Sequence, residues 1–167
     1  DISLSLLMSS DRVTFLKVLF PMTPRKIVAT DHAGVLTEFW VHAIDTLRGS
    51  IIEYRVTSVP DPSCEELCAR GWFTLRIKPL DKNYHGRPSY EIDWIGVDAG
   101  TESCGARFLK KGLPESLMKW ATGDGDLELF SSTTPSEPAL RMWERLAEQG
   151  QAEQVDEFPG RFRFIRG

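Results

Sequence analysis

The order of predicted strands and helices along the chain indicates a single α/β domain. A length of 167 residues suits one domain. Several short segments alternate apolar and polar residues, which is typical of strands, and the segments between them repeat apolar residues every three or four positions, which is typical of helices. With strands and helices interleaved in this way, we expect an open or three-layer α/β arrangement rather than a bundle or a sandwich.

The first half of the chain is predicted to contain both element types. Alternating or β-branched sequence predicts three strands, at residues 13–20, 51–59 and 72–80. Residues 31–48 are predicted to form a helix, because Thr30 can cap its start, its apolar residues recur at helical spacing and Gly49 follows its end. The Ser-Cys-Glu-Glu sequence at 63–66 is a capping-box pattern, which predicts a short helix that ends at Gly71.

The second half continues the alternation of elements. Strands are predicted at residues 90–97, 127–130 and 161–165, with a loop at 82–88 and a turn at 98–105. The apolar spacing up to Ala121 predicts a helix, and Pro114 places its start near Gly112, because proline is tolerated in the first turn of a helix. Ser136 is predicted to cap a further helix over residues 137–148.

Charge and cysteine content restrict the classes of function. The net charge of −4 argues against a non-specific nucleic-acid binder, which needs a basic surplus. Three cysteines do not make a disulfide framework, so a reducing, cytoplasmic location is expected, and their spacing without nearby histidines predicts no metal site. No segment approaches the roughly 20 apolar residues of a membrane span. We interpret residues 1–22 as an N-terminal extension or a leader.

The second half also resembles a known enzyme family. The segments YEIDWIGV, GLPESLMKWA, LELF, PALRMWERLAEQG and RFRFI give a strand, a turn with a helix, a strand, a second helix and a closing strand. This order is similar to the core of the GNAT superfamily of acyl-CoA-dependent N-acetyltransferases, over roughly residues 50–167. The resemblance implies a mixed, mostly antiparallel central sheet flanked by helices on both faces. It also implies acetyl-CoA, or another acyl-CoA, as cofactor.

The family binds the pyrophosphate of its cofactor at a helix start with the pattern Arg/Gln-x-x-Gly-x-Gly/Ala. The aligned sequence here is LKKGLP, in which Gly112 matches while Leu109 and Pro114 depart from the pattern. A helix start suits a diphosphate because its free N–H groups and its dipole attract anions. The resemblance therefore implies a cofactor-binding role for these residues: Val97, Arg107, Lys110, Lys111, Gly112, Leu113 and Trp143.

The catalytic groups are expected on the strand at 90–97 and after the strand at 127–130. Alternation places Glu91 and Asp93 on one face with Ile95 and Val97, and the other face carries Ile92, Trp94 and Gly96. Either carboxylate is a candidate general base, and burial is expected to raise its pKa toward neutral. The backbone N–H near Val97, at a bulge, would polarise the thioester carbonyl.

A proton donor is also required, because the departing thiolate must be protonated. Trp143 stands where the family often has a tyrosine that acts as the acid, so a hydroxyl of residues 131–134, with Ser132 as the candidate, or a water takes this role.

Two other interpretations remain open. The departures at Leu109, Pro114 and Trp143 favour a GNAT-like protein that binds or regulates a partner without catalysis. The acidic balance also fits a small α/β interaction module, such as an immunity or anti-defence protein. The partners expected for the enzyme are an acyl-CoA and an amine-bearing acceptor, which is a small amine, an amino acid, a peptide N-terminus or a modified base. A homodimer is a further candidate.

Overall fold

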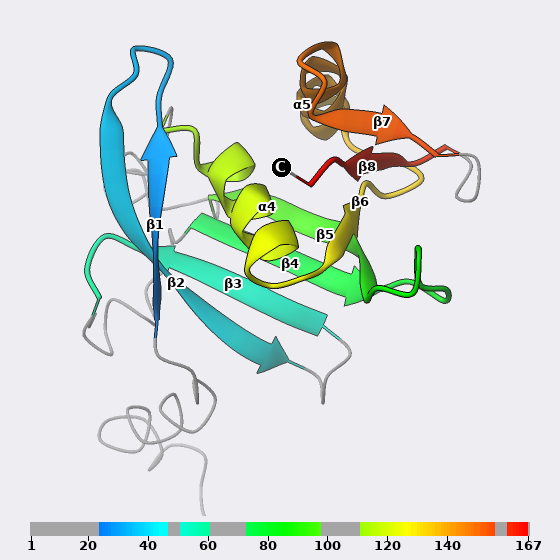
Figure 1. The fold of residues 1–167 in the computed structure, drawn as a ribbon, viewed down its shortest axis with the longest axis horizontal. Coiled ribbons are helices and arrows are strands. Elements are labelled where there is room, and N and C mark those ends of the chain that lie inside the picture. The colour runs from blue at the N-terminus through cyan, green and yellow to red at the C-terminus, as the bar shows by residue number, and fades with distance from the viewer. Residues whose placement is uncertain (1–23, 47–50, 61–72, 98–110, 156–159, 167) are drawn as a thin grey trace, which may run out of the picture.

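The computed structural model describes residues 24–46, 51–60, 73–97, 111–155 and 160–166, which form an eight-stranded sheet and two helices (Figure 1). The elements are β1 (Arg25–Thr30), β2 (Leu36–Thr46), β3 (Ile51–Thr57), β4 (Phe73–Pro79), β5 (Ser89–Val97), α4 (Leu113–Gly123), β6 (Glu128–Phe130), α5 (Glu137–Glu148), β7 (Ala152–Gln154) and β8 (Phe162–Phe164).

The strands lie in the order β1-β2-β3-β4-β5-β6-β8-β7. Among these described strands, β5 and β6 form the one parallel pair, and every other neighbouring pair is antiparallel. An α/β fold with a mostly antiparallel sheet is therefore confirmed.

Most predicted elements of the second half are present. The strands predicted at 51–59, 72–80, 90–97, 127–130 and 161–165 correspond to β3, β4, β5, β6 and β8. Both helices begin where their sequences indicate, with Pro114 in the first turn of α4 and the Ser136 hydroxyl accepting a hydrogen bond from the Ala139 N–H at the start of α5. The elements predicted at 13–20, 63–71 and 98–105 lie outside the described residues.

The helix predicted at 31–48 is wrong, because residues 36–46 form strand β2. The carboxylate of Asp31 accepts hydrogen bonds from the N–H groups of Ala33 and Val35, both at 2.9 Å, and so forms a turn that reverses the chain. The β1–β2 hairpin then places Phe39 opposite Ile27, and both side chains are buried. The period-2 pattern of buried residues in this segment prevails over the 3–4 spacing that suggested a helix. Strands β1 and β7 were not predicted.

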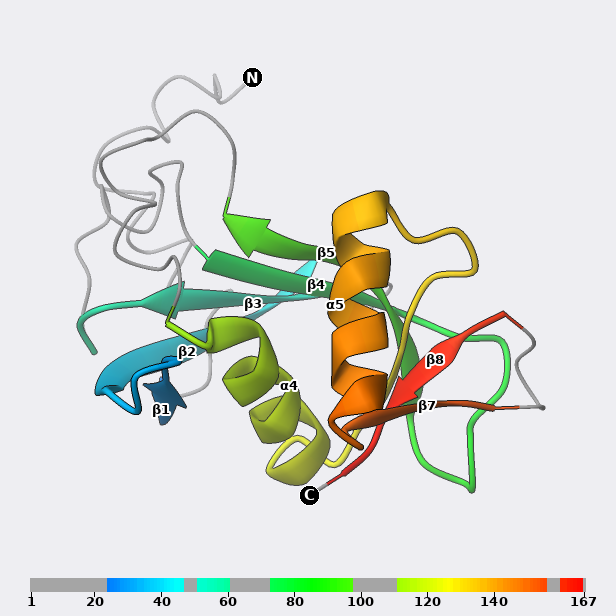
Figure 2. The same ribbon diagram turned by 90° about the horizontal axis from the view of Figure 1, so that it is seen from above.

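Helix α4 covers one face of the curved sheet (Figure 2). Its Leu113, Leu117 and Met118 are fully buried and belong to the same hydrophobic core as apolar residues from strands β1 to β6. The opposite face of the sheet carries charged residues. There the buried carboxylate of Glu53 binds Arg55 at 2.8 Å and Arg76 at 2.9 Å, so its charge is neutralised locally.

The start of α4 is pressed against the end of β1. Gly112 precedes the helix with φ 73° and ψ 21°, in the left-handed region. A Cβ atom at this position would lie 2.1 Å from the carbonyl oxygen of Thr30. Glycine is therefore required at residue 112 for both its backbone conformation and the closeness of β1.

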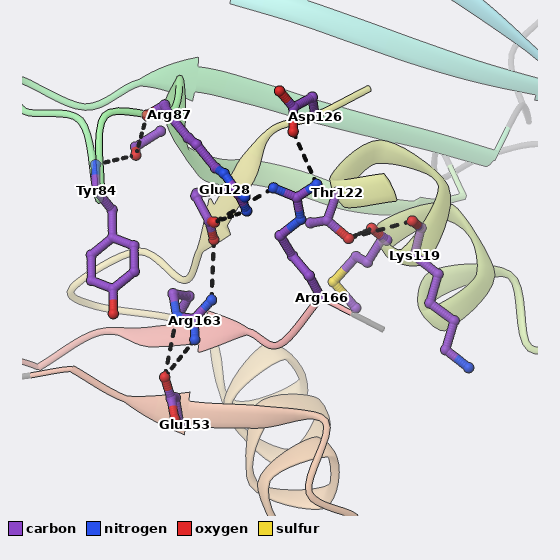
Figure 3. Close-up of polar contacts among 11 residues, drawn as sticks. Tyr84, Arg87, Lys119, Thr122, Asp126, Glu128, Glu153, Arg163 and Arg166 are labelled. Atoms are coloured by element: carbon purple, nitrogen blue, oxygen red, sulfur yellow. Dashed lines mark hydrogen bonds and ion pairs between the residues drawn. The ribbon is translucent and has the colours of Figure 1, made fainter. Parts of the chain in front are cut away.

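The C-terminal strand is tied to the sheet through the carboxylate of Glu128 (Figure 3). The Glu128 side chain is 3% exposed. It accepts hydrogen bonds from Arg163 on β8 at 3.1 Å and from Arg87 at 3.4 Å, and Arg166 lies 4.0 Å away. Arg163 also binds Glu153 on β7 at 2.6 Å. A carboxylate buried to this degree requires such partners, and the network joins β6, β7, β8 and the β4–β5 connection.

The contact between Gly112 and Thr30 can be tested with two glycine substitutions. Gly150 has nearly the same φ, 72°, but nothing lies within 4 Å of a Cβ built there. We expect Gly150→Ala to lower the free energy of unfolding by about 1–2 kcal/mol, the cost of left-handed backbone. Gly112→Ala should lower the free energy of unfolding by at least about 2 kcal/mol more than Gly150→Ala, because the added Cβ also overpacks against Thr30. Urea unfolding measures both, and equal losses would contradict the close contact.

Candidate functional site

Strands β5 and β6 form a fork. They pair in parallel only over Ser89–Glu91 and Glu128–Phe130. Strand β5 then continues to Val97, while the chain after Phe130 turns away toward α5. In α/β folds, ligands bind in crevices at the carboxyl ends of parallel strands, next to the point where the chain leaves the sheet. The open end of this fork is such a position.

A β-bulge in β5 lies just beyond the last paired residue. Ile92 is opposite Ile77 and Trp94 is opposite Arg76, so Asp93 is an extra residue in β5. The bulge brings Ile92 and Ile95 to the core side, whereas Asp93 and Trp94 follow one another on the charged side. The prediction that Ile92 and Trp94 share a face is therefore wrong, because simple alternation fails at the bulge.

The open end of the fork is a cleft with a volume of about 510 Å³. One wall is the bulged part of β5, and the other is the loop after β6 with the first turns of α5. Of the residues predicted to have a function, Asp93, Ser132 and Trp143 meet here. The full lining is Ile92, Asp93, Trp94, Ile95, Ser132, Thr134, Pro135, Ser136, Pro138, Ala139, Met142 and Trp143.

The closed end of the fork is held by Arg161. Its Nη1 donates to the carboxylate of Glu91 at 2.5 Å and to the carbonyl oxygen of Ser131 at 2.8 Å. Ser131 is fully buried, and its hydroxyl accepts a hydrogen bond from the N–H of Phe162 at 2.9 Å. The last paired residue of β5 and the first residue after β6 are therefore joined through one guanidinium, which fixes where the strands separate.

Glu91 is part of this structural connection. Burial raises the pKa of Glu91, but hydrogen bonds and charge attraction from Arg161 and Lys78 outweigh burial, and the pKa lies below its ordinary value. The prediction that burial raises the pKa of Glu91 toward neutral is therefore wrong. Glu91 is also outside the cleft lining. Asp93 remains as the carboxylate that a ligand in the cleft would meet.

Trp143 forms a wall of the cleft. It is 2% exposed, and its ring stacks on that of Phe162 with centroids 6.1 Å apart and an interplanar angle of 14°. This packing suits an apolar contact surface and provides no acid, as expected from the indole. Ser132 is half-buried and lines the cleft, one residue after Ser131 at the closed end of the fork.

The other residues predicted to bind the cofactor are only partly described. Gly112 and the half-buried Lys111 lie at the start of α4, Leu113 is buried in the core, and the backbone of Val97 pairs with Phe73. Arg107 and Lys110 lie outside the described residues. In the part of the chain that the structure describes, the cleft lining includes none of these positions.

Two residues of the site were not predicted. Arg161 was part of a strand whose charged side chains have no evident partner in the sequence. Trp94 was predicted to lie on the same face as Ile92, because a bulge leaves no clear signal in an alternating segment. The pairing of Arg161 with Glu91 joins positions 70 residues apart, which local patterns do not reveal.

The contribution of the Glu91 charge to stability can be tested by measuring the free energy of unfolding at several pH values. A carboxyl whose pKa falls on folding contributes stability above its unfolded pKa, and this contribution is lost as the pH falls through the folded value. We expect Glu91→Gln to be less stable than the wild type at pH 7, and the difference should shrink below its ordinary pKa of 4.5. Chemical unfolding from pH 7 to pH 3 measures this. Glu144→Gln, on the exposed side of α5, is the matched control, and a pH-independent deficit for Glu91→Gln would contradict the assignment.

Comparison of the chain with family models, curated proteins and solved structures finds no match. Within the described ranges, no group of three or more His, Cys, Asp or Glu side chains could hold a metal ion. Neither of the two described helices is long and apolar enough to cross a membrane.

Proposed function

We propose that the protein is an N-acyltransferase that transfers an acetyl group from acetyl-CoA to an amine, with the cleft between β5 and β6 as its active site. The observation that carries the proposal is the bulged fork. It places a carboxylate, Asp93, and a hydroxyl, Ser132, on opposite walls of one cleft. The order strand, helix, strand, helix over β5, α4, β6 and α5, with β8 as the closing strand, supports it, because apart from the additional strand β7 it is the order of the GNAT core.

The free edge of β5 gives the cleft its binding groups. From Ile92 onward, no described strand pairs with β5 on the β6 side, so the backbone N–H and C=O groups of this edge are available to a ligand. The pantetheine arm of CoA is extended and carries amides, which can pair with such an edge. Met142 and Trp143 offer an apolar surface opposite.

The diphosphate of the donor is proposed to lie toward the start of α4. The free N–H groups and the dipole of a helix N-terminus favour a diphosphate. Lys111 adds a positive charge next to Gly112. Pro114 has no N–H, so one donor of this first turn is missing.

The proposal includes the GNAT arrangement of helices on both faces of the sheet, with α4 on one of them.

The chemistry follows from the positions of Asp93 and Ser132. The acceptor ammonium gives a proton to Asp93, directly or through a water, and its nitrogen then attacks the thioester carbonyl carbon. A C–N bond forms and the C–S bond breaks. The departing thiolate takes a proton from Ser132 or from a water, and this donor regains a proton from the nitrogen, which loses its second proton as the amide forms. An N–H of the β5 edge near Val97 stabilises the oxygen of the carbonyl as negative charge develops on it.

A second candidate function is acyl-CoA binding without transfer. Glu91 is held in ion pairs, and Trp143 packs in the core at the position of the usual acid. Glu91, where a general base was expected, and Trp143, at the position of the family's acid, therefore have structural roles. This candidate shares the donor site with the enzyme and differs from it only in turnover.

Binding of the donor is tested by thermal unfolding with acetyl-CoA, free CoA and ADP. A ligand at 100 times its Kd stabilises a protein by about 2.7 kcal/mol, so a clear rise in Tm is expected with both CoA species. ADP contains the nucleotide diphosphate without the pantetheine arm and should give a smaller shift. No shift at millimolar acetyl-CoA, or an equal shift with ADP, would refute the proposed donor site.

Catalysis is tested by release of free thiol from acetyl-CoA in the presence of a panel of primary amines. Asp93→Asn should lower kcat by roughly 10²–10⁴-fold, the range for loss of a general base. The affinity for acetyl-CoA should stay unchanged. Asp124→Asn, at an exposed aspartate after α4, is the matched control and should keep full activity. Acetyl-CoA binding without turnover of any amine would favour the second candidate.

A further inference from the structure

Trp94 is exposed at the edge of the cleft. It is 46% exposed, and a Cβ built on Gly96 would lie 3.8 Å from Cζ2 of its indole. The indole therefore extends along β5 over a residue that has no side chain. An exposed indole beside a cleft offers a flat surface to a ligand, because tryptophan has the strongest attraction for cations among the aromatic side chains.

The bulge makes Asp93 the immediate neighbour of Trp94 on the same face of the sheet. Asp93 Oδ1 lies 3.5 Å from Nζ of Lys78, and Lys78 is opposite Glu91 on that face. Without the extra residue, Asp93 and Trp94 would point to opposite faces. The cleft therefore presents a carboxylate and an indole side by side.

The charge of the cleft favours a cation. In the described lining, Asp93 is the one ionisable side chain, and no Lys, Arg or His is present. Lys78 lies outside the lining and is closer to Glu91, at 3.0 Å, than to Asp93. A ligand that enters the cleft thus meets one negative charge.

The start of α5 borders the cleft but is a poor anion site. The Ser136 hydroxyl already accepts the Ala139 N–H, and Pro138 has no N–H to offer. Glu137, which is paired with Arg141 at 2.9 Å, places a further carboxylate in the same turn. The two walls of the cleft therefore agree in disfavouring an anionic ligand.

We infer that the cleft binds an ammonium group between the carboxylate of Asp93 and the indole of Trp94, carried on an apolar body without negative charge. Only the identification of this ligand as the acyl acceptor rests on the proposed function. A free amino acid is a poor ligand, because its α-carboxylate would lie next to Asp93. The acceptor class is thus a primary amine on an aromatic or aliphatic skeleton.

The inference is tested by calorimetric titration of the full chain, without an acyl donor, with three probes. Phenethylamine, 2-phenylethanol and 3-phenylpropionate share a phenyl ring on a two-carbon spacer and differ in carrying a positive charge, no charge and a negative charge. Phenethylamine should bind tightest and 3-phenylpropionate weakest. The inference is overturned if phenethylamine fails to bind at millimolar concentration, or if 3-phenylpropionate binds as tightly.

Variants assign the binding to the two side chains. Asp93→Asn should reduce the affinity for phenethylamine toward that for 2-phenylethanol, with the contribution of Trp94 remaining, and should leave the affinity for 2-phenylethanol unchanged. Trp94→Leu should weaken phenethylamine binding roughly three- to thirtyfold, and Trp94→Phe should retain most of it. Asp124→Asn and Leu140→Ala, at exposed positions outside the lining, are the matched controls and should bind like the wild type. Unchanged binding by Asp93→Asn or Trp94→Leu would overturn the inference.

The donor and acceptor proposals can fail separately. If the probes bind as expected and acetyl-CoA does not, the ammonium site stands and the transferase is refuted. If acetyl-CoA binds and is turned over while phenethylamine does not bind, the ammonium site alone is refuted.

Discussion

The separation of β5 from β6 is the constraint on which the site depends. Parallel strands that stay paired leave no room between them, so a cleft here requires the pairing to stop at a defined residue. Arg161 sets this position by binding Glu91 and the carbonyl of Ser131 together. The bulge at Asp93 then turns β5 just after the connection, and the cleft opens between the two strands.

Two carboxylates on one strand have different roles because their surroundings differ. Glu91 lies between two cations, Arg161 and Lys78, and its lowered pKa keeps it charged and structural. Asp93, two residues later, lines the cleft. The same principle applies to Glu128, whose burial among arginines ties the C-terminal strand to the sheet. Glu91 and Glu128 thus hold strands in place, whereas Asp93, whose one cationic neighbour in the described residues is Lys78 at 3.5 Å, faces the cleft.

The sequence predicted the parts of this architecture that depend on local patterns. Pro114 and Ser136 marked both helix starts, and alternation located β3, β4 and β5. The helix predicted at 31–48 was wrong because Asp31 forms a turn and the strand that follows is half-buried. A bulge was expected near Val97, but it lies at Asp93, because its position depends on the pairing of β5 with β4. The pairing of Arg161 with Glu91 could not be predicted, since it joins positions 70 residues apart. Asp93, Ser132 and Trp143 were predicted singly, and the fold brings them to one cleft.

The most direct measurement is amide hydrogen exchange of the full chain with and without acetyl-CoA. Exchange reports which backbone N–H groups become protected on binding. The account predicts added protection on the free edge of β5, from Ile92 to Val97, together with residues 131–139 across the cleft. Protection confined to other elements, such as the β1–β2 hairpin, or no protection at saturating acetyl-CoA, would contradict the assignment of the fork as the acyl-donor site.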